Sequence, residues 1–390
     1  MQNRIQHLYR DEQGMSFVFV GFGLIAFITA TSLAIDVGMF MNARTQAQNS
    51  ADAGALSGVT ALVFNDYTNR TSTGPAVQSA VSTANANKVI GEAPLVAPGD
   101  VTFPLSPTGQ PNRVQVIVNR TSAHGNPVQT LMGTLLGVRT VDIGAIAIAE
   151  ASPANAMTCV KPFMIPDRWA EHTNPPWDSG DTYEAYDNKG NPLANADVYI
   201  NDPNDETTYT GYTTKKDAGT KLTLRAGTGD NINPSFYYSW KMPGDVGGDF
   251  YRDNIANCNP SMMIAGNKII QEPGDKSGPT IQGIEDLIAK DPDAYFEPGP
   301  APGCNCVKNS KYSISPRVFP IPLYNPEYYA LGKKNGRVAD FEIANFLGFF
   351  AEPPQGNTIP GRITAILGVV APNSGKVPVT AFPKAIRLVQ

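Results

Sequence analysis

Residues 15–35, MSFVFVGFGLIAFITATSLAI, form an apolar stretch of 21 residues without a formal charge. An α-helix of this length rises about 31 Å, which matches the hydrocarbon core of a bilayer. We therefore predict a transmembrane helix over residues 15–41, preceded by a short segment, residues 1–14. One alternative is a cleaved signal peptide, with Ser32-Leu33-Ala34 as its small-x-small site, although its apolar region is usually only about 7–15 residues long. The other is a buried helix of a soluble protein.

The charges that flank this stretch indicate its orientation. Arg4 and Arg10 precede it, Asp36 follows it directly, and Arg44 is the nearest basic residue on the far side. Because basic residues concentrate on the cytoplasmic side of membrane helices, we expect a single-pass protein with a cytoplasmic N-terminus and an exported body. A carboxylate at the end of a span is either hydrated at the interface or paired with a neighbour in an assembly, which makes Asp36 the first candidate functional residue.

The helix is expected to continue well beyond the membrane. Residues 36–64 contain no proline, and their small residues recur every three or four positions, which places them on one helix face. This pattern predicts one helix over residues 14–64, about 75 Å long. The stripe of small residues can pack against the protein's own sheet or against a helix of another subunit, and both interpretations stay open. Its candidate packing or assembly residues are Ala47, Ala51, Gly54 and Gly58, with Ala43 and Ala61 at its ends.

Residues 42–150 are expected to form a small α/β module on this helix. The residue patterns predict a helix over 75–90, strands over 101–105 and 113–118, a helix over 127–138 and a strand over 141–149. A long N-terminal helix packed on a small sheet is a pilin-like arrangement, an analogy of architecture and not of function.

Residues 151–390 carry most of the Pro, Tyr and Trp and are expected to form a β-rich mixed domain with long loops. Strands are predicted over 197–200, 220–224, 236–240, 312–322, 339–350, 362–370 and 385–389, and helices over 261–270 and 280–289. The fold class predicted for the whole chain is therefore α+β: a long transmembrane helix, a pilin-like α/β module and a β-rich domain.

The charge of the chain argues against nucleic acid as a partner. The 390 residues include 30 Lys and Arg against 35 Asp and Glu, a formal net charge of −5, whereas a nucleic-acid binder needs a basic surface that replaces phosphate counterions. Hydrophobic residues make up 42% of the chain, which is enough for a folded core.

The four cysteines, Cys159, Cys258, Cys304 and Cys306, all follow the predicted span. In an exported body they can form disulfides, and the three possible full pairings stay open. A zinc site made of all four thiolates is the alternative. Such sites usually show two close pairs, whereas this chain has one C-x-C and two distant cysteines, which disfavours zinc.

Motifs for catalysis are absent from the sequence. It contains no G-x-S-x-G, no P-loop and no H-E-x-x-H, so we expect neither an enzyme nor a small-molecule substrate. The acidic loop 202–206, DPNDE, invites a calcium hypothesis, but Thr207 and Thr213 stand where an EF-hand has Gly and Glu. Structural calcium is thus a weak alternative to a cofactor-free protein.

Aromatic residues gather at 236–240, FYYSW, and at Trp169 and Trp177. They could line a glycan-binding face, but in a β-rich domain we expect them to fill the core.

The N-terminal segment resembles TadE/TadG-like proteins of the Tad (tight adherence, Flp pilus) system. The resemblance combines Gly14 before the apolar run, Asp36-x-Gly38 at its outer end, and Ala43-Arg44 followed by residues 48–53, QNSADA. Later islands are similar to exported TadG-related proteins. They are Cys159 with Pro162-Phe163, Ile165-Pro166-Asp167-x-Trp169, Tyr251-Arg252-x-Asn254-Ile255 with Cys258-Asn259, Gly278-Pro279-Thr280-x-Gln282-Gly283, and Ser315-Pro316-Arg317.

This resemblance implies a bitopic inner-membrane protein with a periplasmic or extracellular body, acting as an accessory or minor component of pilus assembly and cell adhesion. Its partners would be other Tad pilus or pseudopilin components. Pseudopilins of this system are cut after a Gly whose fifth following residue is Glu, whereas Phe19 occupies that position after Gly14. The departure fits TadG-like members, which keep their N-terminus. A binding or adhesive periplasmic protein unrelated to pili and an envelope hydrolase are the alternatives.

Overall fold

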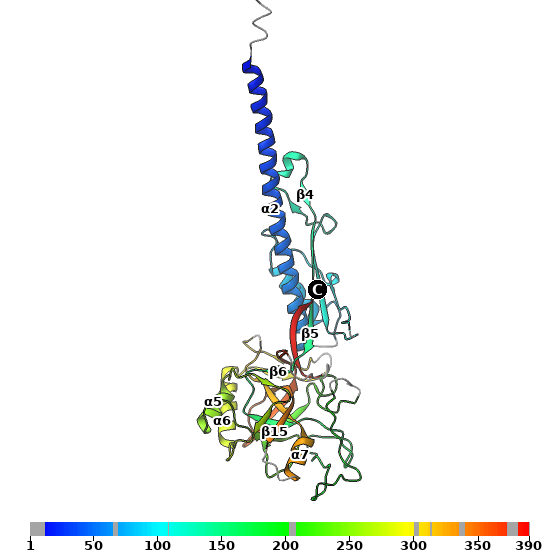
Figure 1. Ribbon diagram of the computed structural model, residues 1–390, viewed down its shortest axis with the longest axis vertical. Coiled ribbons are helices and arrows are strands. Elements are labelled where there is room, and N and C mark those ends of the chain that lie inside the picture. Colours follow the sequence, from blue (N-terminus) through cyan, green and yellow to red (C-terminus); the bar gives the residue numbers. More distant parts are fainter. Residues whose placement is uncertain are drawn as a thin grey trace, which may run out of the picture.

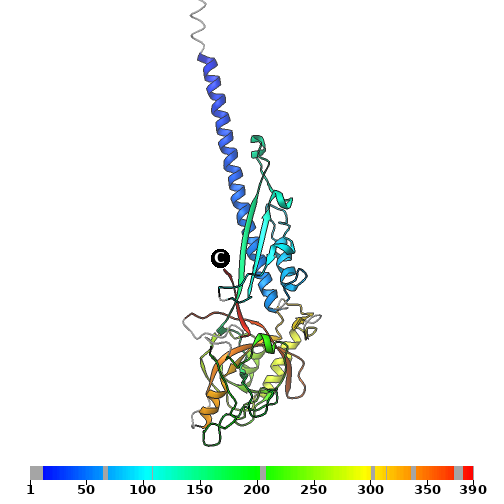
Figure 2. The ribbon, with the colours of Figure 1, turned by 90° about the vertical axis from the view of Figure 1, so that its right-hand side faces the viewer.

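The computed structural model describes residues 12–64, 69–107, 109–202, 208–299, 304–312, 314–334, 340–372 and 381–389. A long N-terminal helix leads into a small sheet, and a rounded body rich in strands follows at the far end (Figures 1 and 2). The predicted long apolar helix and the mixed α and β content are thereby confirmed.

The N-terminal helix α2 (Glu12–Phe64) is a single element of 53 residues, about 80 Å long. Its upper part stands clear of the rest of the chain, and its lower part lies against helix α3 (Pro75–Ala86) and a sheet (Figure 2). Alanine and glycine dominate the buried face of the lower part, which lets the neighbouring backbones approach closely.

A five-stranded sheet packs on the lower part of α2, in the order β1 (Val101–Thr102), β2 (Arg113–Arg120), β5 (Ile143–Pro153), β18 (Pro383–Val389) and β17 (Ile366–Leu367). β2 alternates inward and outward residues along its length, with Val114, Val116 and Val118 buried, as period-two patterning requires. β18 comes from the C-terminal end of the chain and pairs antiparallel with β5 from Pro153↔Lys384 to Ile148↔Val389. The last strand therefore completes a sheet that begins near residue 101.

The helix predicted over residues 127–138 is wrong. The segment instead forms a hairpin of β3 (Val128–Gln129) and β4 (Thr140–Val141), joined by the 3-10 turn η3 (Gly133–Leu136). Gly137 closes that turn with φ 85°, a left-handed conformation that suits glycine and ends a helix. The hairpin tip reaches up along α2, beyond the sheet (Figures 1 and 2).

The body contains a seven-stranded sheet in the order β11–β15–β14–β7–β9–β8–β16. A further pairing of β15 with β16 closes this sheet into a ring, with β11 attached at its edge. The strands are β7 (Phe163–Pro166), β8 (Lys221–Ala226), β9 (Phe236–Ser239), β11 (Lys268–Ile270), β14 (Val318–Tyr324), β15 (Asp340–Ala351) and β16 (Thr358–Thr364).

Shorter elements surround the ring. They are α4 (Thr214–Asp217), α5 (Gly248–Ala256), α6 (Ser277–Lys290), α7 (Pro326–Lys334), the β6 (Ala156–Met157)–β10 (Met263–Ile264) pair and the β12 (Tyr295–Glu297)–β13 (Cys306–Lys308) pair. The 3-10 turns η1 (Pro98–Asp100) and η2 (Ser122–His124) belong instead to the module on α2, at the start of β1 and after β2. The predicted helix over 280–289 is confirmed as α6. Sequence patterns gave no sign of α5 or α7.

Two other predicted elements of the body are wrong. Residues 261–270 were expected to be helical but form β10 and β11 around a turn at Gly266, whose φ is 91°. Residues 197–200 form no strand, only a single bridge between Val198 and Ala170. At 261–270, pairing of β10 with β6 and of β11 with β15 overrides the local helical pattern.

Aromatic side chains fill the core of the body. Trp169 and Trp240 are buried, and Tyr329 stacks on Phe341 with ring centroids 4.5 Å apart. Trp177 is half-buried under the guanidinium of Arg168. The alternative of an exposed aromatic face at Trp169 and Trp240 is therefore wrong for these residues.

Candidate assembly site on the N-terminal helix

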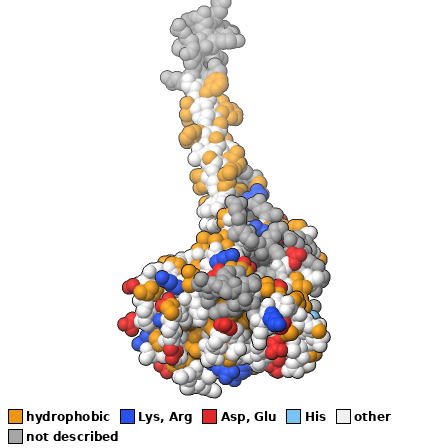
Figure 3. Space-filling view, turned by 60° about the horizontal axis from the view of Figure 1, so that its bottom comes forward, with side chains coloured by type: hydrophobic (Ala, Val, Ile, Leu, Met, Phe, Trp, Pro, Cys, Tyr) orange, Lys and Arg blue, Asp and Glu red, His pale blue; other side chains and the backbone are white. Residues whose placement is uncertain are grey.

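The upper part of α2 exposes its apolar side chains. Phe17 is 80% exposed, and the side chains from Phe17 to Ile35 lie open on nearly every face of the helix. Over Ser16–Phe64 the helix is long and apolar enough to cross a membrane. In the space-filling view its upper part shows hydrophobic side chains without charge, whereas Lys, Arg, Asp and Glu are spread over the body (Figure 3).

Asp36 directly follows the uncharged apolar stretch, and its side chain is only 4% exposed. Its carboxylate accepts hydrogen bonds from the backbone N–H groups of Leu131 at 3.0 Å and Met132 at 3.1 Å, and a third from that of Gly133. The carboxylate thus satisfies the N–H groups at the start of η3. Its partner in this chain is therefore a loop almost a hundred residues further along.

The stripe of small residues below Asp36 is buried within the chain. Ala47 and Ala51 have no exposed surface. A Cβ on Gly54 would lie 3.0 Å from Ala84 Cβ on α3, and one on Gly58 would lie 2.9 Å from Val114 Cγ1 on β2. Of the two interpretations left open by the sequence, the structure places these four residues in the intramolecular seam. Another subunit's helix cannot occupy that same face.

The four cysteines form two disulfides, Cys159–Cys258 and Cys304–Cys306. The first joins the entry to β7 to the end of α5 across 99 residues, and the second closes the C-x-C turn before β13. A zinc site of four thiolates is not formed. Among the described residues the one group of possible metal ligands is Glu297 with Cys304 and Cys306, and both of its sulfurs are in a disulfide. Of the acidic loop expected as a weak calcium candidate, 203–206 lies outside the described residues.

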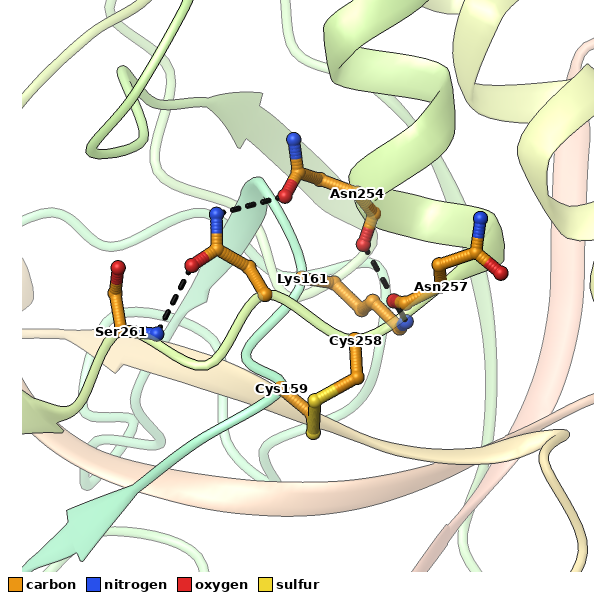
Figure 4. Close-up of a disulfide and its surroundings, with 7 residues drawn as sticks. Cys159, Lys161, Asn254, Asn257, Cys258 and Ser261 are labelled. Atoms are coloured by element: carbon orange, nitrogen blue, oxygen red, sulfur yellow. Dashed lines mark hydrogen bonds between the residues drawn. A yellow bond between two sulfur atoms is a disulfide. The ribbon is translucent and has the colours of Figure 1, made fainter.

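Lys161 lies beside the first disulfide and was not singled out by the sequence. Its ammonium donates to the carbonyl oxygens of Asn257 at 2.8 Å and Asn254 at 3.4 Å, at the C-terminus of α5 (Figure 4). Burial lowers the pKa of Lys161 to about 7, and the nearby charge of Lys290 acts in the same direction. The amine thus caps a helix end whose dipole favours a positive group.

Asp167, from the Ile165-Pro166-Asp167-x-Trp169 island, is a second buried ionisable group. Its carboxylate accepts from the hydroxyls of Tyr199 at 3.0 Å and Tyr209 at 3.1 Å, and from the backbone N–H groups of Tyr212 and Arg168. Burial raises the pKa of this carboxyl to about 6, although these hydrogen bonds oppose the shift.

The other islands that resemble TadG-related proteins also hold the body together. Gly283 on α6 lies against α5, where an added Cβ would come within 2.6 Å of Ile255 Cβ. Arg317 is buried and donates to the carbonyl oxygens of Ala294 at 2.6 Å and Ala351 at 2.9 Å. These residues therefore have structural roles.

The comparisons with known proteins point to the N-terminal helix. Residues 14–61 match the model of the family described as "Putative Flp pilus-assembly TadE/G-like". No curated protein and no solved structure matches the chain. The match covers the apolar part of α2, Asp36 and the whole stripe of small residues from Ala43 to Ala61. The resemblance expected from the sequence is thus confirmed, and over residues 14–61 the chain is TadE/G-like.

Proposed function

We propose that the chain is a membrane-anchored, TadG-like component of Flp/Tad pilus assembly or tight adherence, and that it acts by protein–protein assembly. The observation that carries the proposal is the family match over residues 14–61, because it coincides with a helix whose first half is apolar and free of contacts with the body.

In this proposal α2 has two tasks. Its upper part anchors the chain in the inner membrane, with the N-terminus in the cytoplasm. Its lower part, from Asp36 to Phe64, extends about 43 Å from the membrane and carries the pilin-like sheet and the body into the periplasm. Two disulfides in the body suit an oxidising compartment. Other Tad pilus or pseudopilin components would then contact the body or the exposed faces of the stem, by which we mean the lower part of α2 with α3 and the five-stranded sheet.

We also infer that the chain works without catalysis. The groove of about 560 Å³ beside β8 and β9 is lined by Arg225, Tyr238, Asp275 and Lys276 among others. Asp275 is the single carboxylate among these lining residues, whereas acid–base cleavage of glycosides needs a pair. Turnover of any member of a glycan and peptide panel by the purified chain, abolished by one carboxylate substitution, would overturn this inference.

The test of the proposed function is removal of the chain from its host, with surface pilin and adherence as readouts. We expect surface pili and tight adherence to be lost while the pilin subunit still accumulates in the inner membrane. Re-expression of the full chain should restore both. Unchanged pili in the deletion strain would contradict the proposal.

Topology is tested separately by protease accessibility. The body should be digested in spheroplasts and protected in inside-out vesicles. Digestion of the body only from the cytoplasmic side would contradict the proposed orientation.

A further inference from the structure

We propose that the tip of the β3–β4 hairpin, residues 130–138, dips into the outer interface of the bilayer that α2 crosses, and that its ligand is the lipid surface. This inference rests on the proposed membrane anchoring of α2. It adds a second contact between the protein and the membrane, made by a segment almost a hundred residues away in sequence.

The position of the tip follows from Asp36. Its carboxylate binds the N–H groups of residues 131–133, so the tip lies against α2 where the apolar stretch ends. Ser32, one turn above Asp36, is buried like Asp36, whereas Leu33 and Ile35 between them remain exposed. One face of the helix is therefore covered at this level, and its other faces stay open.

Leu131 and Val138 give the tip an exposed apolar surface, beside the exposed hydroxyl side chain of Thr134. Residues 130–138, TLMGTLLGV, contain no formal charge. Leu131 is 62% exposed and Val138 is 51% exposed, at the level of the exposed Leu33 and Ile35 of α2. The apolar surface of the tip thus continues the apolar surface of the helix. Interfacial amphipathic helices bury their apolar faces by about 5–10 Å at the boundary between head groups and acyl chains, and we expect a similar depth for the tip.

Backbone hydrogen bonding makes this location possible. Unsatisfied backbone polar groups are costly in lipid, so a non-helical segment held at the interface needs partners for them. The N–H groups of residues 131–133 bind Asp36, those of Gly137 and Val138 bind the carbonyl oxygens of Thr134 and Gly133, and that of Thr130 binds the carbonyl oxygen of Arg139. The hydroxyl of Thr130 donates to the carbonyl oxygen of Val138 at 2.6 Å.

Charged side chains mark the water side of the tip. Arg139 directly follows the apolar residues and is exposed, and Arg44, two turns below Asp36 on α2, is exposed as well. Cations at this level suit the phosphates of lipid head groups. A second protein covering the tip is the rival occupant. Continuity with the bare apolar helix favours lipid.

The experiment measures the depth of a nitroxide label on the full chain, reconstituted in nanodiscs of phosphatidylethanolamine and phosphatidylglycerol. Because the native cysteines are paired, a label attaches to one introduced thiol, in Leu131→Cys or Val138→Cys. Ile25→Cys on α2 is the control for the anchor. Ile146→Cys is the matched aqueous control, since its side chain is 56% exposed and its backbone carbonyl lies beside Gln48, about 18 Å below Asp36 along the helix.

We expect the labels at 131 and 138 to lie between the label at 25, in the middle of the span, and the label at 146, with accessibility to oxygen several-fold higher relative to a water-soluble nickel chelate than at 146. If they match 146 while 25 is in lipid, the hairpin proposal fails and the anchor stands. If 25 also matches 146, the anchor fails and the hairpin proposal with it. Protection at 131 and 138 from both reagents would show a protein contact and overturn the assignment to lipid.

A charge placed on the tip provides an independent check. Leu131→Glu should move the label at 138 toward the aqueous values, because a carboxylate resists the interface. Ile146→Glu, which places the same charge on the sheet, should leave that label in lipid. Equal behaviour of the two variants would overturn the proposal.

Discussion

Asp36 acts at the residue scale as a cap for a distant turn. Helix and turn N-termini leave N–H groups without partners, and a carboxylate from a neighbouring element can satisfy them. Here three consecutive N–H groups converge on one side chain. An amide has a single acceptor oxygen and a donor in place of the second, so asparagine is a poor substitute.

We therefore expect Asp36→Asn to loosen the hairpin tip without releasing the helix. Amide hydrogen exchange at Leu131, Met132 and Gly133 should become at least about tenfold faster, the equivalent of losing one net hydrogen bond. Asp52→Asn is the matched control on the same helix, since Asp52 accepts from Gln48 in the next turn up and not from the hairpin tip. Equal exchange at the tip in the two variants would show that Asp36 does not hold it.

Lys161 makes the stability of the body depend on pH. Burial lowers its pKa to about 7 in the folded chain, whereas the unfolded chain protonates the amine up to about pH 10.4. Between these values the unfolded state binds more protons, so the contribution of Lys161 to the unfolding free energy rises with pH. Below pH 7 both states are protonated, and the cost of burying the charge is fully present.

The measurement compares the full chain with Lys161→Met by denaturant unfolding between pH 7 and 9.5. As the pH rises over this range, the unfolding free energy of the unmodified chain should increase by up to about 3 kcal/mol more than that of the variant. Lys221→Met removes an exposed lysine and should follow the unmodified chain. If the unfolding free energies of Lys161→Met and of the unmodified chain changed with pH in parallel, the expected effect would be contradicted.

Sequence patterns single out Asp36 but miss its partners, and they do not single out Lys161. Asp36 stands out because it ends an apolar stretch, but nothing in residues 131–133 marks them as its partner. Lys161 lies between Val160 and Pro162 with no distinguishing spacing. Its burial depends on α5, which docks from more than ninety residues away.

At the scale of elements, the α2–α3 seam depends on having no side chain at Gly58. A Cβ there would lie 2.9 Å from Val114 Cγ1, 3.0 Å from Ala80 Cβ and 3.2 Å from the carbonyl oxygen of Ala76. Alanine normally gains about 1 kcal/mol over glycine inside a helix. Overpacking should outweigh this gain, so we expect Gly58→Ala to destabilise the module by about 1–3 kcal/mol.

Gly38→Ala is the control for this prediction, because no atom lies within 4 Å of a Cβ built at Gly38. Thermal unfolding of the stem, followed by helix circular dichroism, should show a lower midpoint for Gly58→Ala only. A raised midpoint in Gly58→Ala would mean that the seam has room for a methyl group.

Elements with strong local patterns were predictable from sequence. α2 has no proline over its whole length, and α6 has apolar residues at helical spacing. The hairpin at 128–141 was missed because its leucines also match helical spacing, while Gly133, Gly137 and the remote carboxylate of Asp36 favour a turn. The ring of strands in the body could not be foreseen, since it depends on pairings between strands far apart in the chain, β7 with β14 and β8 with β16.

On the scale of the whole molecule, the chain passes twice between stem and body. It enters the body after β5 and returns through β17 and β18 to pair with β5 again. The division of the chain at residue 150 stays a prediction, but the return of β18 gives the stem sheet a strand from each end of the body. This double connection orients the body relative to the membrane anchor without a long flexible linker among the described residues.

The Cys159–Cys258 disulfide links two distant parts of the body covalently. Its removal should therefore destabilise the body more than removal of the other disulfide. Closing a 99-residue separation restricts the unfolded chain by about 4–5 kcal/mol in the chain-entropy model, whereas a separation of two residues contributes about 1 kcal/mol. We expect Cys159→Ser/Cys258→Ser to lower the unfolding free energy of the body accordingly, and Cys304→Ser/Cys306→Ser to lower it far less. Denaturant unfolding followed by the fluorescence of the buried Trp169 and Trp240 reports on the body alone. Equal losses in the two double variants would mean that the long disulfide does not restrain the unfolded chain, and the body would then depend on its strand ring for stability.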